Sequence, residues 1–182
     1  MTTLETERLI LRPLREDDAD GFIALIDNWN VARTVARIPY PYARSDFDSF
    51  LERQMAKPSQ SREPTFAIEA KGGPAHAVGL IGLHKEQGDD DNVTRLGYWI
   101  GEPFWGQGLV SEGVRMVIAH AFNDLGFDTI LAGVATANPA SGRILEKSGF
   151  VVTGEGSAWS IANKAELPST FVRLTREEWT GS

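Results

Sequence analysis

Residues 97–111 read G-Y-W-I-G-E-P-F-W-G-Q-G-L-V-S, and this stretch decides the fold. An apolar, strand-like run over residues 93–100 leads into it, and an amphipathic helical pattern begins at about Leu109. Glycines and a proline fill the turn between the two. A glycine-rich turn from a strand to a helix leaves backbone N–H groups unpaired and pointing one way, and the helix dipole adds to their field. The stretch therefore predicts an anion-binding turn.

On both sides of this stretch, strand and helix patterns follow one another. Residues 109–125 carry the strongest helical periodicity, and Asn138 followed by Pro139 predicts the start of a later helix. Strand-like patterns cover residues 8–12, 65–70, 77–83, 93–100, 129–136, 150–153 and 170–174, and residues 154–168 have room for a hairpin. Interleaved strands and helices indicate a single α/β or α+β domain with a mixed sheet over residues 1–182.

Composition narrows the class of protein. A chain of 182 residues with 42% hydrophobic content is long enough to bury one core. The absence of cysteine excludes disulfides and thiol chemistry. No apolar run is long enough to span a bilayer and the first residues lack a signal-peptide core, so we expect a cytoplasmic protein without membrane partners. The net charge of −7 argues against nucleic acid and is compatible with a cationic substrate, although acidic proteins often use charge only for solubility.

Two motifs together resemble the signatures of the GNAT family of N-acetyltransferases. Residues 105–112, W-G-Q-G-L-V-S-E, resemble its acyl-CoA-binding signature, and residues 138–150, N-P-A-S-G-R-I-L-E-K-S-G-F, resemble its second signature. The opening T-E-R-L-I-L-R-P of residues 6–13 resembles the branch that acetylates ribosomal-protein N-termini, the RimJ and RimL type. The resemblance covers nearly the whole chain. It implies a mostly antiparallel central sheet of about six or seven strands, with a splayed pair in the middle and about four flanking helices.

The resemblance also implies acetyl-CoA as co-substrate and assigns roles around the turn. Backbone groups of Trp99, Ile100 and Gly101 would contact the pantetheine arm. Asn138 would bond to the same arm, and Ser141 would lie near the thiol. The residues of the cofactor turn are Trp105, Gly106, Gln107, Gly108, Leu109, Val110 and Ser111. The duller interpretation makes Asn138 a plain helix cap and gives Ser141 no chemical role.

Acetyl transfer to an amine needs a base, a donor to the developing oxyanion and a hydrogen bond to the leaving thiolate. His84 and Glu102 are the candidate bases, although a solvated strand-end histidine and a loop cap are the simpler interpretations. Ser141, or a tyrosine such as Tyr98, is the candidate donor to the thiolate. The family's usual carboxylate before the Gly-Tyr pair is missing, because Arg95 stands there. Since no cysteine is present, we expect direct transfer without a covalent enzyme intermediate.

Other classes of function remain as alternatives. A dinucleotide-binding fingerprint would need a third glycine where Ser111 stands and an acidic residue further on, and both are missing. The three histidines are scattered, so no metal is expected. A non-catalytic acyl-CoA-binding module stays open because of Arg95.

The acceptor stays open between a protein N-terminal α-amine and a small-molecule amine. We expect it to contact the loops of residues 28–42 and 154–166. The aromatic residues of these loops are candidates for lining a pocket, with a core or dimer contact as the alternative: Trp29, Tyr40, Tyr42 and Trp159. Monomer and homodimer remain equally open.

Overall fold

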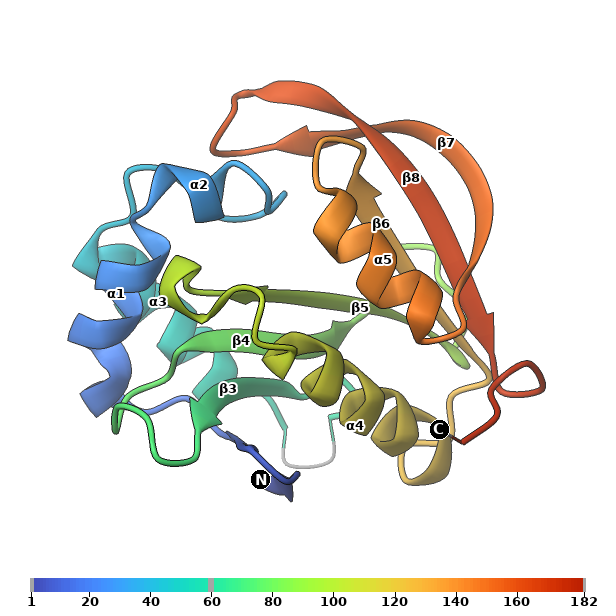
Figure 1. The fold of residues 1–182 in the computed structure, drawn as a ribbon, viewed down its shortest axis with the longest axis horizontal. Coiled ribbons are helices and arrows are strands. Elements are labelled where there is room, and N and C mark those ends of the chain that lie inside the picture. The colour runs from blue at the N-terminus through green and yellow to red at the C-terminus, as the bar shows by residue number, and fades with distance from the viewer. Residues whose placement is uncertain (1, 59–60, 182) are drawn as a thin grey trace.

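A computed structural model describes residues 2–58 and 61–181 (Figure 1). Across these residues one sheet of eight strands has the order β1-β2-β3-β4-β5-β6-β8-β7. The strands are β1 (Leu4–Glu5), β2 (Leu9–Arg12), β3 (Thr65–Ala70), β4 (Gly79–His84), β5 (Val93–Ile100), β6 (Thr129–Ala135), β7 (Val151–Ser160) and β8 (Ala165–Thr175). Neighbouring strands are antiparallel except for β5 and β6. The mixed, mostly antiparallel α/β fold is confirmed, with slightly more strands than predicted.

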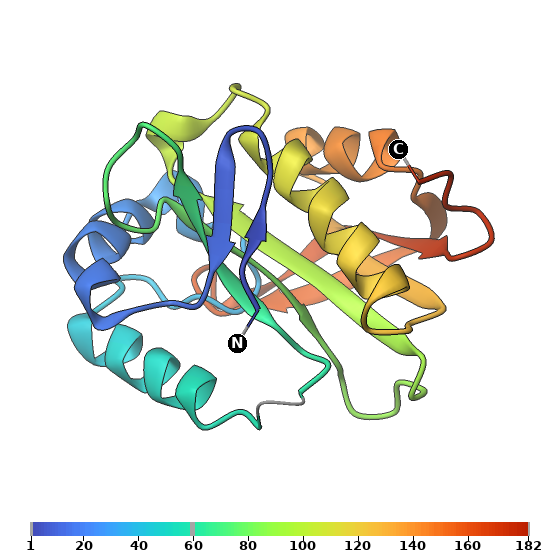
Figure 2. The same cartoon turned by 90° about the horizontal axis from the view of Figure 1, so that it is seen from below.

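Five α-helices in the described part of the chain cover the two faces of the sheet (Figure 2). They are α1 (Ala19–Ile26), α2 (Trp29–Ala32), α3 (Arg44–Met55), α4 (Leu109–Asn123) and α5 (Pro139–Lys147), with short 3-10 turns η1 (Glu16–Asp18) and η2 (Glu102–Phe104). The first three helices pack on one face, and α4 and α5 pack on the other. None of these helices has both the length and the apolar character needed to cross a membrane.

A separate hydrophobic core lies on each face of the sheet. On the α4 face, buried residues such as Val114 and Ile118 pack against β2, β4 and β5. On the other face, the ring of Phe22 from α1 meets Trp99 of β5 edge-on, with ring centroids 4.9 Å apart. Because side chains alternate along a strand, Trp99 and its neighbour Ile100 enter opposite cores. Strand β5 is therefore held from both sides, which fixes the strand that leads into the glycine turn.

The parallel strands β5 and β6 are paired over only three positions. Val93, Thr94 and Arg95 align with Thr129, Ile130 and Leu131, and no register pair joins the strands beyond them. Strand β5 continues to pair with β4 as far as Ile100, while β6 pairs with β8 along its whole length. The predicted splayed pair in the middle of the sheet is confirmed, and one edge of β5 is left without a neighbouring strand.

The long β7–β8 hairpin arches over this divergence towards α2 (Figure 1). At its tip, the N–H of Ile161 donates to the carbonyl of Ala36 at 2.9 Å. The side-chain amide of Asn163 donates to the carbonyl of Arg33 at 3.0 Å. These contacts join the C-terminal hairpin to the N-terminal part of the chain. Residues 154–168, whose pattern left room for a hairpin, contain its turn.

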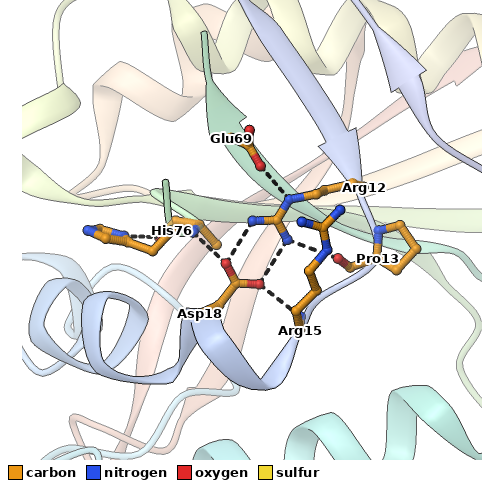
Figure 3. A network of polar contacts seen from close by, with 7 residues as sticks. Arg12, Pro13, Arg15, Asp18, Glu69 and His76 are labelled. Atoms are coloured by element: carbon orange, nitrogen blue, oxygen red, sulfur yellow. Dashed lines mark hydrogen bonds and ion pairs between the residues drawn. The ribbon is translucent and has the colours of Figure 1, made fainter. Parts of the chain in front are cut away.

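A buried ion-pair network fixes β2 to the turn before α1 (Figure 3). Arg12 is 2% exposed and donates to both oxygens of Asp18 at 2.8 and 2.7 Å, and its Nε donates to Glu69. Asp18 also accepts from the backbone N–H groups of Arg15 and Ala77. Burial alone would raise the pKa of Asp18, but the hydrogen bonds from Arg12 and the backbone hold that pKa below its ordinary value. The network stabilises the start of the helical layer.

Candidate functional site

The turn between β5 and α4 presents a row of open backbone donors. Gly106 and Gly108 take left-handed φ angles of 73° and 76°, which glycine adopts without a steric penalty. Gly108 is also the residue that caps α4, a helix of 15 residues. Among the residues described by the structure, the N–H groups of residues 106–111 have no hydrogen-bond acceptor. They lie at the positive end of the helix dipole, so the turn is suited to an anion.

Side chains of the turn itself hold it in this shape. The indole Nε1 of Trp105 donates to the carbonyl of Ile100 at 2.9 Å, and the Gln107 amide donates to a carbonyl within the turn, also at 2.9 Å. Leu109 and Val110 are buried in the core under α4. The side chain of Val110 therefore points into the core and away from the turn, and its N–H stays open.

Arg8 places a guanidinium beside the turn, and the sequence pattern assigned it no role. Its Nε donates to a carboxylate oxygen of Glu112 at 2.7 Å, and its Nη1 donates to the carbonyl of Gln107 at 2.8 Å. Its Nη2 lies 3.5 Å from the position that a Cβ on Gly108 would occupy. Thr6 and the backbone of Arg8 also donate to Glu112. The recognisable signal was the T-E-R of residues 6–8 together with the glutamate in the first turn of the helix.

The open edge of β5 lies where β6 diverges. The N–H of Gly101 donates to the carbonyl of Val78 at 2.9 Å. Backbone groups alternate along an antiparallel ladder, so Trp99 and Gly101 direct theirs towards β4, and Tyr98 and Ile100 direct theirs towards β6. The backbone groups that Trp99 and Gly101 direct to the β4 ladder therefore face away from the divergence, and the contact of these two residues with the pantetheine arm stays a prediction. The N–H groups of Tyr98 and Ile100 face the side that β6 has left, and the contact of Ile100 with the pantetheine arm stays a prediction.

Tyr98 and Ser141 meet across the divergence. Their hydroxyl oxygens are 2.8 Å apart, which joins β5 to the first turn of α5. Asn138 caps this helix by accepting the Ser141 N–H on its Oδ1 at 3.2 Å. The cap interpretation of Asn138 is thus confirmed, and its contact with a cofactor stays a prediction. Burial raises the pKa of Tyr98 to about 12, so the phenol keeps its proton at neutral pH.

His84, a predicted base, lies on the face of the sheet opposite α5. Leu83 packs under α4, and side chains alternate along β4, so His84 points to the other face. Its ring lies over Gly97, which has no side chain. The distance from Cε1 of the ring to the position that a Cβ on Gly97 would occupy is 3.6 Å. Burial lowers the pKa of His84, and the positive charges of Arg37 and Arg95 lower it further. The imidazole is therefore neutral at pH 7, as a base must be.

The other charged residues near His84 and the turn are already paired. Arg95, which replaces the family's usual carboxylate, forms two hydrogen bonds of 2.9 Å with Asp89 in the β4–β5 hairpin. Glu102 accepts from the side-chain amides of Asn28 at 2.6 Å and Asn30 at 3.1 Å. It therefore ties η2 to the start of α2. Within residues 2–58 and 61–181, no cluster of three or more histidine or acidic side chains is arranged to hold a metal ion.

Exposed aromatic side chains gather near the hairpin and α2. The rings of Trp29 and Tyr40 are 5.2 Å apart, and both residues are about two-fifths exposed, at 42% and 39%. Trp159 on β7 is 56% exposed. For Tyr42 the alternative of a core contact is confirmed, because this residue is buried beside Phe22. The pocket-lining role of Trp29, Tyr40 and Trp159 stays a prediction.

Comparison with known proteins assigns the chain to a protein family. A model of the acetyltransferase (GNAT) domain matches residues 8–151. The uncharacterized N-acetyltransferase YoaA of Bacillus subtilis (strain 168) is 31% identical over 151 residues, which cover 83% of this chain and 84% of that protein.

Solved structures agree in fold. Mycobacterium smegmatis RimJ, in complex with CoA-disulfide, matches with a TM-score of 0.80 and 23% identity over 93% of this chain and 83% of its own. Spermidine N-acetyltransferase from Vibrio cholerae, in complex with CoA and spermine, matches with a TM-score of 0.77 and 19% identity over 95% and 97% of the two chains. The family match spans most of the chain and includes the glycine turn, the splayed strands and the capped helix α5, so the chain belongs to the GNAT family and is an N-acetyltransferase.

Proposed function

We propose that this N-acetyltransferase takes its acetyl group from acetyl-CoA and transfers it directly to a primary amine. The observation that carries the proposal is the row of open N–H groups over residues 106–111 beside the unpaired edge of β5. An acyl donor lying along that edge would place its pyrophosphate at the turn, where the helix dipole and the Arg8 guanidinium favour negative charge. Its thioester would then lie towards Ser141.

The groups proposed for the reaction lie on both faces of the sheet, with His84 on one face and Ser141 on the other. The acceptor amine must be neutral to attack, and His84 is the proposed base, acting directly or through water. The N–H of Ile100, on the open edge of β5, donates to the developing oxyanion. Ser141 donates a hydrogen bond to the sulfur that leaves. Glu102 is the second candidate base, although Asn28 and Asn30 already donate to its carboxylate.

A protein N-terminal α-amine is the acceptor class that we place first. Residues 6–13 resemble the ribosomal-protein branch of the family, and RimJ has a similar fold. A small-molecule polyamine is the second candidate. It is supported by the similar fold of a spermidine N-acetyltransferase and by the net charge of −7, which attracts polycations.

Two measurements test the proposal. Calorimetric titration of the purified protein with acetyl-CoA should give one site with a dissociation constant on the order of micromolar. Thiol release should then be followed with N-terminal peptides and, separately, with spermidine. Release that depends on peptide supports the first acceptor class, and release with spermidine alone moves the assignment to polyamines. Absence of acetyl-CoA binding by folded protein would overturn the donor assignment, and binding without any release would contradict the transfer.

A further inference from the structure

We propose that Tyr98 is a positioning residue for acetyl transfer: its hydroxyl donates to Ser141 Oγ and thereby directs the Ser141 proton towards the thioester sulfur. The inference rests on the proposed acetyl-CoA chemistry and adds a residue to it. Tyr98 belongs to the part of β5 that has left β6, and Ser141 belongs to the first turn of α5. Their contact therefore lies beside the opening of the sheet.

The hydroxyl of Ser141 has a different hydrogen-bond partner from the hydroxyl of Ser148, a serine at the C-terminal end of the same helix. Ser148 donates its proton to the carbonyl of Ile144 at 2.8 Å, the usual local bond of a helical serine. In the described chain the only side-chain partner of Ser141 Oγ is Tyr98. A serine hydroxyl has one proton and two lone pairs, so it can accept from the tyrosine and still donate elsewhere.

The direction of the Tyr98–Ser141 bond follows from the partners that each hydroxyl has. If Ser141 donated to Tyr98, the only other acceptor within reach of the phenol proton would be the Ser141 carbonyl, at the long distance of 3.4 Å. If Tyr98 donates, its proton makes the 2.8 Å bond and the Ser141 proton is left for a ligand. Burial raises the pKa of Tyr98 to about 12, which keeps the phenol a donor at neutral pH.

This arrangement acts by hydrogen bonding and needs no proton to leave Tyr98. In the transfer the N–C bond forms, the C–S bond breaks and its electron pair goes to sulfur. The proton lost by nitrogen passes to the base and then to solvent, and the thiolate later takes one from solvent. Ser141 stabilises the thiolate, and donation from Tyr98 polarises the Ser141 hydroxyl and strengthens that bond. Since hydrogen bonds to a charged form favour it, the pair should lower the pKa of the CoA thiol in the complex.

A double-mutant cycle tests this role. Tyr98→Phe removes one hydroxyl, and we expect kcat to fall about tenfold, the equivalent of one hydrogen bond in the transition state. The calorimetric affinity for acetyl-CoA should change less than about twofold, because Tyr98 acts on the leaving sulfur. In a Ser141→Ala background, Tyr98→Phe should have no further effect. Ser148→Ala and Tyr42→Phe, which lose hydroxyls away from the opening, should behave as wild type.

A second readout needs neither acceptor nor turnover. The ultraviolet absorbance of the thiolate, followed against pH, gives the pKa of the CoA thiol in its complex with the protein. We expect this pKa to rise in Tyr98→Phe and in Ser141→Ala, and to rise no further in the double variant. An equal loss of kcat with and without Ser141, or an unchanged thiol pKa in Tyr98→Phe, would overturn the proposal. Failure of the wild type to bind CoA would remove the donor assignment itself, and this role with it.

Discussion

Arg8 and Glu112 are 104 residues apart in the sequence and form an ion pair with 2.7 Å between Nε and Oε2. The Arg8 side chain is 45% exposed and the Glu112 side chain 12% exposed, so the carboxylate is the fixed partner and the guanidinium reaches into solvent. Such partly exposed pairs contribute little to stability. The pair instead orients a cation beside the open N–H groups of the turn.

Replacing Arg8 with glutamine should weaken acetyl-CoA binding about tenfold, because a charge-assisted bond to phosphate is lost. Calorimetric titration at low and high salt measures the effect, which should shrink at high salt as the charges are screened. Arg173→Gln is the matched control: Arg173 also pairs with a glutamate, at 3.0 Å and 37% exposure, but lies on β8. An unchanged affinity at low salt in Arg8→Gln would remove Arg8 from the phosphate site.

Gly108→Glu should abolish detectable acetyl-CoA binding, since a side chain and a negative charge would occupy the anion site. The left-handed backbone adds a cost of about 1–2 kcal/mol to any such substitution. Gly126→Glu controls for that cost, because Gly126 has a similar φ of 70° and open surroundings beyond the other end of α4. Thermal unfolding and calorimetry on both variants separate folding from binding. Normal affinity in folded Gly108→Glu would show that the turn holds no phosphate.

His84→Gln should lower kcat/KM by about 100-fold, a typical contribution of a general base. Burial and Arg37 lower the pKa of His84, so the imidazole loses its proton below the ordinary value of about 6.5. The part of the wild-type kcat/KM profile that comes from His84 should therefore fall only below that value, separate from the titration of an acceptor α-amine at about 7.7–8.0. A pH profile of the variant should lack this acidic limb. If kcat/KM is unchanged in His84→Gln and falls about 100-fold in Glu102→Gln, the base is Glu102.

Asp18→Asn should lower the free energy of unfolding by about 3 kcal/mol at neutral pH, because it removes the charged partner of buried Arg12. The pKa of Asp18 is lowered in the folded state, so its contribution is complete above the unfolded pKa of about 3.9 and is lost as the pH falls through the folded value. Urea unfolding between neutral and acidic pH should show a smaller pH dependence in the variant. Asp20→Asn, on an exposed side chain, should change little. Equal curves for Asp18→Asn and wild type would contradict a stabilising network.

Local patterns predicted the centre of the fold well. The helix predicted over residues 109–125 is α4 (Leu109–Asn123), because its apolar periodicity and the glycines at its ends are signals within one segment. The full length of β7 was not predicted. Gly154 and Gly156 have little intrinsic preference for strands, and pairing with β8 imposes the extended conformation on them. Tertiary pairing, which a single segment does not encode, explains this difference.

The features of the candidate site also differ in how well the local sequence predicts them. The open backbone donors of the turn were predictable because they belong to consecutive residues. The contacts of Arg8 with Glu112 and of Tyr98 with Ser141 join segments that are far apart in the chain. The hydrophobic periodicity of a single segment does not predict such contacts. Which backbone groups of β5 stay open depends on its register against β4. The strand pattern alone therefore did not distinguish Trp99 from Ile100.

The short ladder between β5 and β6 has a thermodynamic consequence. The backbone bonding of the sheet crosses from its N-terminal to its C-terminal half at only three register pairs. A donor molecule lying in the divergence would contact both halves of the sheet. It would therefore stabilise the folded state whenever it is bound. Its binding free energy then adds to the free energy of unfolding in proportion to the logarithm of its concentration over Kd. The fraction of folded enzyme would therefore rise with the concentration of the donor.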